Sequence, residues 1–237
     1  MRELVPAVYA FTGFVVGRVY CIRDRDGLTL IDCGIKQSAK TILAQLSAAG
    51  VTPGRVKRIL ITHGHLDHVG GLQQVQATTG APVMVGSADR PVLEGQLPYP
   101  RAPKDADLSP VGRLMRGGAD QYADPVPVAR ELADGDWLPE VLGGLQVIAT
   151  PGHTPGHLAF WQPERRILFG GDVLGHWPTG LGLPPAAFTV DMAEDIRSLQ
   201  RLAALEPDVL CLGHGAPILD NAAKPLRAFA DRMADKA

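Results

Sequence analysis

Short apolar runs rich in β-branched residues alternate along this chain with longer segments in which apolar residues recur every three or four positions. The short runs predict strands at residues 15–22, 28–32, 56–62, 82–85, 145–150, 157–161, 167–169 and 209–212. The longer segments predict helices at 36–49, 69–79, 191–205 and 222–233, with a shorter one inside 108–116. Early strands followed by strands that alternate with helices are typical of an α/β fold in which helices cover the sheets.

Capping residues support three of these helices. Gly50 and Gly80 come directly after two of them, where a residue with left-handed backbone geometry commonly ends a helix. Asp191 precedes the third helix and Glu194 follows three residues later, which is the spacing of a capping box. The sequence therefore predicts these boundaries from short-range chemistry alone.

Two segments need a separate interpretation. Residues 4–17 are mostly apolar, but Pro6 and Gly13 interrupt them and no small-residue cleavage site follows, so we expect the first strands of a soluble protein rather than a signal peptide. Residues 94–128 combine prolines, arginines and aspartates without a clear period, and connections this long are commonly functional. We expect one domain, residues 1–237, in which 94–128 is an insertion that covers a pocket.

Composition excludes several classes of protein. The chain has 237 residues, of which 46% are hydrophobic and 20% charged, and this suits one substantial packed domain. The formal net charge is -2 and the basic residues are scattered, so neither nucleic acid nor a membrane is an expected partner. Cys21, Cys33 and Cys211 lie far apart, which argues against a disulfide framework and favours a reducing compartment, the cytoplasm.

The densest group of metal-ligating residue types lies between two predicted elements. Residues 62–71 read Thr-His-Gly-His-Leu-Asp-His-Val-Gly-Gly and contain His63, His65, Asp67 and His68. Two histidines spaced two apart on an extended segment point to the same side, so both imidazoles can reach one ion. Asp67 and His68 follow at the turn into the next helix and can serve a second ion. Imidazole with carboxylate suits zinc, and also iron or manganese.

Three further candidates follow the ends of other predicted strands. His153 comes after 145–150, Asp172 after 167–169, and His214 after 209–212. Strand ends can deliver side chains to one edge of a sheet, and the neighbouring glycines permit tight loops. We therefore expect two divalent cations, most suitably zinc. The first ion would be bound by His63, His65 and His153. The second would be bound by Asp67, His68 and His214, and Asp172 would bridge the two.

Other residues have supporting roles in this interpretation. Asp32 and His157 are expected to orient metal ligands by hydrogen bonds from behind them. His176, Trp177 and Phe188 are expected to contact substrate, because 175–190 and 94–128 are the segments free to form a pocket. Arg101, Lys104, Arg113 and Arg116 could meet an anionic group or form a solvated face. Single cysteines near the site are expected to pack in the core.

Together these residues resemble the metallo-β-lactamase superfamily. The resemblance rests on the His-x-His-x-Asp-His motif, on the later His153, Asp172 and His214 in that order, and on the Leu-Ile-Asp-Cys-Gly turn that contains Asp32. It covers nearly the whole chain and implies a four-layer αββα sandwich with a binuclear site at one edge. It also implies hydrolysis by a metal-bridging hydroxide, with Asp172 as the bridging residue. We expect Asp67, from its position beside both cations, to orient the hydroxide, so Asp67 and Asp172 are the expected catalytic residues.

Departures from the family pattern narrow the expected substrate. Asp172 stands where β-lactamases usually carry cysteine or serine, which argues against antibiotic hydrolysis as the main activity. Only a short segment follows His214, so the glutathione-binding domain of glyoxalase II is not expected here. We expect a glyoxalase II-like hydrolase of a small thioester or lactone, and leave open whether it forms a homodimer. The alternatives are β-lactam or phosphodiester hydrolysis, a mononuclear iron dioxygenase of the persulfide type, and a metal-binding module without turnover.

Overall fold

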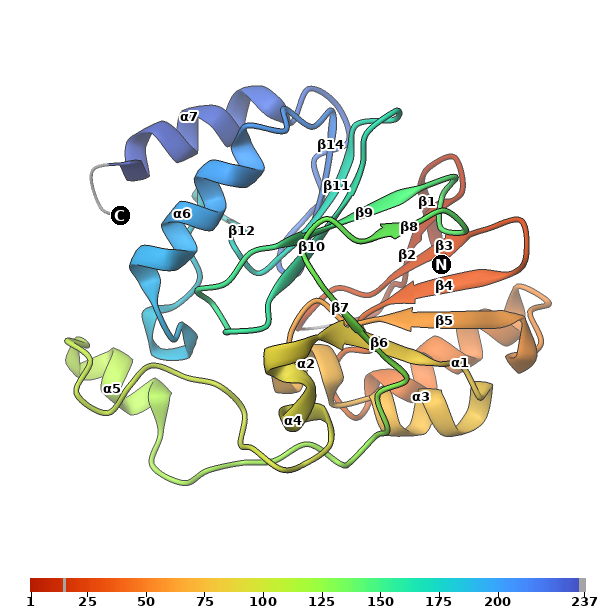
Figure 1. The fold of residues 1–237 in the computed structure, drawn as a ribbon, viewed down its shortest axis with the longest axis horizontal. Coiled ribbons are helices and arrows are strands. Elements are labelled where there is room, and N and C mark those ends of the chain that lie inside the picture. Colours follow the sequence, from red (N-terminus) through yellow and green to blue (C-terminus); the bar gives the residue numbers. More distant parts are fainter. Residues whose placement is uncertain (15, 235–237) are drawn as a thin grey trace.

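Two β-sheets pack face to face, and helices cover the outer face of each. The computed structural model describes residues 1–14 and 16–234. Within these residues the first sheet has seven strands in sequence order: β1 (Arg2–Val5), β2 (Val8–Ala10), β3 (Tyr20–Arg23), β4 (Leu28–Ile31), β5 (Val56–Leu60), β6 (Val83–Gly86) and β7 (Arg130–Leu132). Its outer face is covered by α1 (Ser38–Ala48) and α3 (Leu72–Thr79) (Figure 1).

The second sheet contains the later strands. Its order is β14 (Val209–Leu212), β11 (Ile167–Gly171), β10 (Leu158–Gln162), β9 (Leu145–Ala149) and β8 (Trp137–Leu138). The helices α6 (Met192–Ala203) and α7 (Ala223–Met233) cover it, and β12 (Gly175–Trp177) pairs with β13 (Gly180–Gly182) beside it (Figure 1). Short helices α2 (Leu66–Val69), α4 (Arg90–Leu93) and α5 (Pro110–Arg116) lie in the connections.

Three buried clusters correspond to the three interfaces between the four layers. Ile42 of α1 and Leu72 of α3 pack below the first sheet, in one cluster. Phe160 and Phe169 of the second sheet belong to the cluster between the two sheets. A third cluster joins the second sheet to α6 and α7 and includes Leu226. Each fully buried side chain of this size contributes roughly 1.5–3 kcal/mol, so the layers are held mainly by apolar burial. The fold is the expected αββα sandwich.

Every predicted strand has a counterpart, although the boundaries differ. The prediction for 15–22 begins at a residue outside the described ones, and the strand observed there is β3. The expectation of early strands within 4–17 is met by β2 and the end of β1, whereas sequence patterns missed β7, β8, β12 and β13, which have only two or three residues each. Such short strands are stabilised by pairing with neighbours and carry little periodicity of their own.

The predicted helix at 69–79 is wrong in its first part, because two helices share this region. α2 ends at Val69 and α3 begins at Leu72, with Gly70 and Gly71 between them. A Cβ atom on Gly71 would lie 2.5 Å from the carbonyl oxygen of Cys33, so the glycines let the chain pass close to the turn after β4. Two predicted helix ends are confirmed. Gly80 ends α3 with a left-handed φ of 68°, and the Asp191 side chain caps α6 by accepting a hydrogen bond from the backbone N–H of Glu194.

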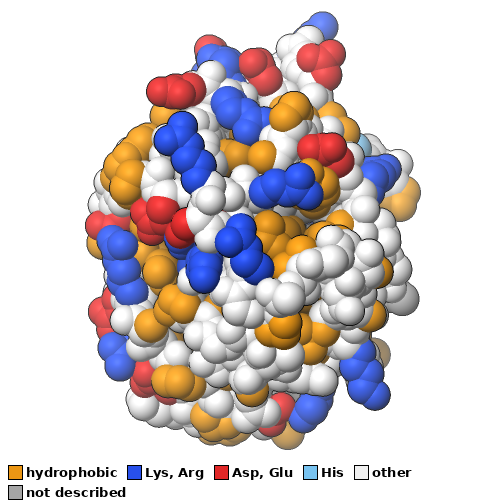
Figure 2. Space-filling view, turned by 90° about the vertical axis from the view of Figure 1, so that its right-hand side faces the viewer, with side chains coloured by type: hydrophobic (Ala, Val, Ile, Leu, Met, Phe, Trp, Pro, Cys, Tyr) orange, Lys and Arg blue, Asp and Glu red, His pale blue; other side chains and the backbone are white. Residues whose placement is uncertain are grey.

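The surface away from α5 carries mixed charge. Lysine and arginine side chains lie interspersed with aspartate and glutamate over this face (Figure 2). Among the described residues, no helix has both the length and the apolar character needed to cross a bilayer. Cys21, Cys33 and Cys211 are buried free thiols, in agreement with the expectation that they pack in the core.

Candidate metal centre

Four strands bring the metal-ligating residues to one edge of the sandwich. His63 follows β5, His153 follows β9, Asp172 follows β11 and His214 follows β14. Because β5 belongs to the first sheet and the other three strands to the second, the site lies where the two sheets meet. The expectation that these strand ends converge is met in the structure.

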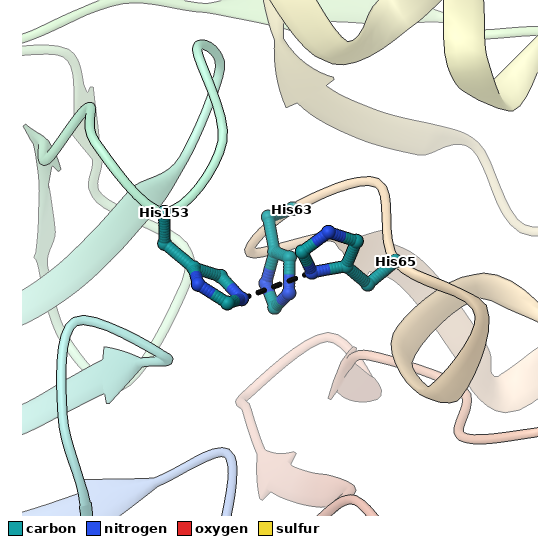
Figure 3. A group of neighbouring side chains, drawn as sticks. All are labelled: His63, His65 and His153. Atoms are coloured by element: carbon teal, nitrogen blue, oxygen red, sulfur yellow. Dashed lines mark hydrogen bonds between the residues drawn. The ribbon is translucent and has the colours of Figure 1, made fainter. Parts of the chain in front are cut away.

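Three histidines form the first group of ligands. The ligating atoms of His63, His65 and His153 all lie within 4.8 Å of one another. Their rings surround a common point, with Nδ1 of His65 facing Nε2 of His153 at 2.9 Å (Figure 3). His63 is fully buried, and His65 and His153 are also buried. This group matches the first ligand set expected from the sequence.

Asp67, His68 and His214 form the second group. Their ligating atoms also lie within 4.8 Å of one another, and Oδ2 of Asp67 is 3.0 Å from Nε2 of His214. Asp67 and His68 are the two middle residues of the short helix α2. Trp177 stacks on the His214 ring at 5.7 Å between centroids and 28° between planes, so β12 supports the outer side of this group.

The Asp172 carboxylate lies between the two groups. Its Oδ2 atom is 3.6 Å from Nε2 of His153 and 3.9 Å from Nε2 of His63, both in the first group. The same atom is 3.1 Å from Nε2 of His214 and 3.4 Å from Nε2 of His68, both in the second group. One carboxylate oxygen therefore reaches ligands of both groups, which is the arrangement expected of a bridging residue.

Hydrogen bonds fix which nitrogen of each histidine faces the centre. Nδ1 of His63 is 3.0 Å from the hydroxyl of Thr62, which itself donates to Asp32 and so must accept from His63. Nε2 of His65 donates to the carbonyl oxygen of Pro100 at 2.7 Å. The proton on His63 is therefore on Nδ1 and that on His65 on Nε2, which leaves a lone pair on each inward nitrogen.

Hydrogen bonds fix the orientation of two further histidines in the same way. Nδ1 of His68 donates to Asp32 at 2.8 Å. Nδ1 of His153 is 3.2 Å from the hydroxyl of Thr189, which donates to the carbonyl of Pro185 and therefore accepts from His153. The inward Nε2 atom of His153 thus also carries a lone pair, and Nε2 is the nitrogen of His68 that faces the centre. The outward hydrogen bonds of both residues are those commonly made by metal-bound imidazoles.

The residues present fit divalent cations. Among the described residues, the buried atoms His63 Nε2, His68 Nε2 and Asp172 Oδ1 make no hydrogen bond. Buried polar atoms without partners are costly, and the facing lone pairs of His65 and His153 repel one another unless a cation or proton lies between them. Nitrogen and carboxylate ligands in these numbers suit zinc, iron or manganese.

Acidic side chains set the charge of the second group. Burial opposes protonation of His68, but the carboxylates of Asp172 and Asp32 raise its pKa well above the ordinary value. Burial opposes ionisation of Asp67, but His68 and His214 lower its pKa to about 2. Burial also opposes ionisation of Asp172, whose pKa the same two histidines hold well below the ordinary range. A divalent cation bound here would replace the protons of these imidazoles and would be attracted by the ionised carboxylates.

Asp32 and His157 lie directly behind the ligands. Asp32 has φ 62° and accepts hydrogen bonds from the backbone N–H and the hydroxyl of Thr62, as well as from His68. Nε2 of His157 accepts the backbone N–H of Asp172 at 2.9 Å, and its Nδ1 donates to the hydroxyl of Thr150. Burial lowers the pKa of His157 to about 3, so this imidazole is neutral and can act as the acceptor.

Sequence reasoning missed Asp89, which connects two ligand-bearing loops. This fully buried carboxylate accepts from the backbone N–H of Gly64 at 2.8 Å, between His63 and His65. It also accepts from the hydroxyl of Thr154 at 2.6 Å and the backbone N–H of Gly156 at 2.8 Å, in the loop after His153. The available signal was its position shortly after the strand predicted at 82–85, the pattern that identified the other candidates.

A pocket of about 730 Å³ opens above the metal centre, and His65, Asp67, His153, Asp172 and His214 line its floor. Trp177 and Phe188 line it as well. His176 is outside this lining, as far as the described residues show; its Nδ1 is 2.9 Å from the carbonyl oxygen of Ala216. The insertion 94–128 contributes walls to the pocket, including Tyr99 and Met115.

The four basic residues of the insertion differ in position. Arg101 and Arg116 line the pocket, whereas Lys104 and Arg113 are not among its described lining residues. Arg113 donates to the carbonyl oxygen of Leu108 at 2.5 Å, so this guanidinium supports the start of α5. Two of the four candidates for an anion contact therefore line the same pocket as the metal ligands.

Comparisons with known proteins agree with this geometry. Residues 12–214 match the model of the metallo-beta-lactamase superfamily. The chain is 30% identical to a Bacillus subtilis protein named "Probable metallo-hydrolase YflN", over 98% of this chain and 92% of that protein. It is 32% identical to a hydroxyacylglutathione hydrolase of Rhodobacter capsulatus, over 68% of this chain but 48% of that protein.

Solved structures show the same fold. The subclass B3 metallo-beta-lactamase BJP-1 of Bradyrhizobium japonicum superposes with a TM-score of 0.71 and 27% identity, covering 99% of this chain and 90% of that one. The similarity thus extends over both sheets and their covering helices, and not only over the ligand motif. With its fold, its ligand order and its relatives in agreement, the chain belongs to the metallo-β-lactamase superfamily.

Proposed function

We propose that this protein is a binuclear metal-dependent hydrolase that cleaves a small thioester or lactone. The observation that carries the proposal is the position of Asp172, whose Oδ2 lies within 3.9 Å of histidine nitrogens from both ligand groups. A carboxylate so placed would join two cations into one site. The names of relatives, metallo-hydrolase and hydroxyacylglutathione hydrolase, support hydrolysis of an acyl group.

The two groups of side chains would hold the cations, zinc being the most suitable, with Asp172 shared between them. When bound, such ions polarise a carbonyl oxygen and lower the pKa of a water molecule so that it becomes a nucleophile near neutral pH. The lone pairs of His63, His65 and His153 already point inward, so this group needs no tautomer change before it binds an ion. Preorganised ligands of this kind avoid a reorganisation cost.

Residues of the pocket would orient the reactants. Asp67 lines the pocket floor and its pKa is about 2, so its ionised carboxylate can accept a hydrogen bond from the attacking water and direct it toward the substrate. Trp177 and Phe188 would pack against the substrate and exclude bulk water. The three buried thiols support the further proposal of a reducing compartment such as the cytoplasm.

A substrate panel with metal analysis tests the proposal. Purified protein, loaded with zinc, iron or manganese in turn, is assayed with acyl thioesters, lactones, phosphodiesters and β-lactams. We expect about two metal ions per chain and turnover of thioesters or lactones, and a loss of roughly a hundredfold or more in Asp172→Ala. Hydrolysis of β-lactams or phosphodiesters alone would assign a different substrate class.

Two other outcomes would contradict the proposal itself. One iron per chain with oxygen consumption would identify a mononuclear dioxygenase. Two bound metals without turnover of any compound in the panel would indicate a binding module.

A further inference from the structure

We propose that the pocket above the metal centre binds an uncharged, apolar acyl chain, so that the protein prefers longer aliphatic or aryl acyl groups over short or anionic ones. This inference rests on the proposed function, because it assigns the substituent of the carbonyl group that is hydrolysed. It is drawn from the walls of the pocket rather than from the ligands at its floor.

The walls are apolar and come from distant parts of the chain. Val16 and Ile35 lie near the first sheet, Tyr99 and Met115 belong to the insertion 94–128, and Phe188 lies in the connection before α6. Pockets for small molecules typically have volumes of roughly 300–1,000 Å³ and predominantly apolar walls, and this one, at about 730 Å³, is large for a two-carbon acyl group. An apolar acyl chain bound here would remove this apolar surface from contact with water, which is favourable.

One of the two arginines in these walls, Arg101, is already paired with a carboxylate. The guanidinium of Arg101 donates to the carbonyl oxygens of Arg116 at 3.1 Å and Ala119 at 3.0 Å, and it pairs with the carboxylate of Asp120. Its side chain is only 16% exposed. Arg101 therefore holds the loop after α5 in place over the pocket and has little capacity left for a substrate anion.

Arg116 is also tied to the insertion. Its Nε donates to the carbonyl oxygen of Ala102 at 2.6 Å, so the two arginines cross-link the two ends of the segment that forms this wall. Each guanidinium donates to backbone carbonyl groups that would otherwise be exposed, and this leaves the wall more apolar. Apart from the metal ligands, the surface that the described lining residues present to an acyl chain consists mostly of carbon atoms.

Kinetics with a series of acyl thioesters tests the inference. The acetyl, butanoyl, hexanoyl and octanoyl thioesters of N-acetylcysteamine share one leaving group and differ only in chain length. Burial of each methylene should raise kcat/KM by roughly threefold to fourfold until the pocket is filled. The adipoyl thioester, which ends in a carboxylate, should be hydrolysed at least about tenfold less efficiently than the hexanoyl thioester.

Two neighbouring residues of α5 provide a matched pair of variants. Met115 lines the pocket, whereas Leu114 is 81% exposed and is not among the described lining residues. Met115→Gln should reduce the preference for octanoyl over acetyl by roughly threefold to tenfold. Leu114→Gln, the same kind of change one residue earlier, should leave the series as in the unmodified protein.

A binding measurement keeps the inference separate from the proposed function. Butanamide, hexanamide and octanamide are titrated into the zinc-loaded protein by calorimetry at two temperatures. We expect Kd to fall roughly threefold to fourfold per methylene, with a negative heat-capacity change, whether or not any thioester is hydrolysed.

The outcomes distinguish the two claims. Chain-length-dependent binding without hydrolysis would reject the thioesterase activity and keep the apolar pocket. Hydrolysis and binding that are both independent of chain length would overturn the inference while leaving the hydrolase intact. A preference for the adipoyl over the hexanoyl thioester would also overturn it, and would assign Arg116 to binding an anion.

Discussion

Oδ2 of Asp32 lies 2.8 Å from Nδ1 of His68, and this contact turns Nε2 of His68 toward Asp67 and Asp172. A carboxylate behind a metal-binding imidazole fixes its tautomer and increases its basicity. Asp32 therefore fixes the orientation of one imidazole of the second group from behind the proposed metal centre.

Asp32→Asn should weaken metal binding and activity by roughly 10–100-fold, because the amide cannot replace the ionised acceptor for His68. The backbone at this position has φ 62°, which asparagine tolerates, so the substitution changes charge with little backbone strain. Zinc affinity is measured by competition with a chelating dye. Asp107→Asn, at an exposed position, is the control. An unchanged zinc affinity in Asp32→Asn would reject the role assigned to this carboxylate.

Asp89→Asn should destabilise the protein, because Asp89 accepts three hydrogen bonds that join the loops bearing His65 and His153. An amide group would place N–H donors against the donors of Gly64 or Gly156. We expect a loss of about 2–4 kcal/mol in the free energy of unfolding, measured by urea denaturation. Asp231→Asn, at an exposed position of α7, should cost less than about 0.5 kcal/mol. Equal midpoints of urea unfolding for Asp89→Asn and Asp231→Asn would contradict the role of Asp89 in joining the two loops.

Asp195 should make stability depend on pH. It is fully buried in α6, its carboxylate oxygens have no partner among the described residues, and burial raises its pKa to about 8. Because the folded pKa lies above the unfolded one, the folded state binds more protons. This contribution to stability is fully present below the ordinary aspartate pKa of 3.8 and is lost as the pH rises to about 8.

Asp195→Asn removes that titration. Its free energy of unfolding relative to the unmodified protein should therefore increase by more than about 1 kcal/mol between acidic and mildly alkaline pH. Urea denaturation is carried out across this range in the presence of a chelator, so that metal binding does not contribute. A difference between the two proteins that stays constant with pH would show that Asp195 does not titrate in this range.

Removal of metal should lower stability. Without an ion, His63 Nε2, His68 Nε2 and Asp172 Oδ1 are buried and unpartnered, among the atoms described. Zinc at about a hundred times its Kd should stabilise the fold by about 2.7 kcal/mol relative to chelator-treated protein, as measured by urea denaturation. His214→Ala, which removes a ligand of the second group only, should reduce the metal content from about two ions per chain to about one. Identical unfolding curves with zinc and with chelator would exclude a structural contribution of the site.

The sequence by itself determined the features that depend on near neighbours. The i, i+2 spacing of His63 and His65, the glycine at position 80 and the Asp191 cap act within one turn or strand, so their effects can be predicted from local geometry. Placing candidate ligands after strand ends also identified His153, Asp172 and His214, because strand ends at one sheet edge lie close together whatever their separation in sequence.

Only the tertiary structure decided the contacts between distant segments. Asp172 meets both ligand groups because β11 pairs with β14 and the second sheet packs on the first, and no local pattern encodes that pairing. The hydrogen bonds of Asp89 and the walls of the pocket likewise join residues far apart in the chain. Such contacts are fixed by the packing of whole layers, where apolar burial selects one arrangement and polar groups must then find partners within it.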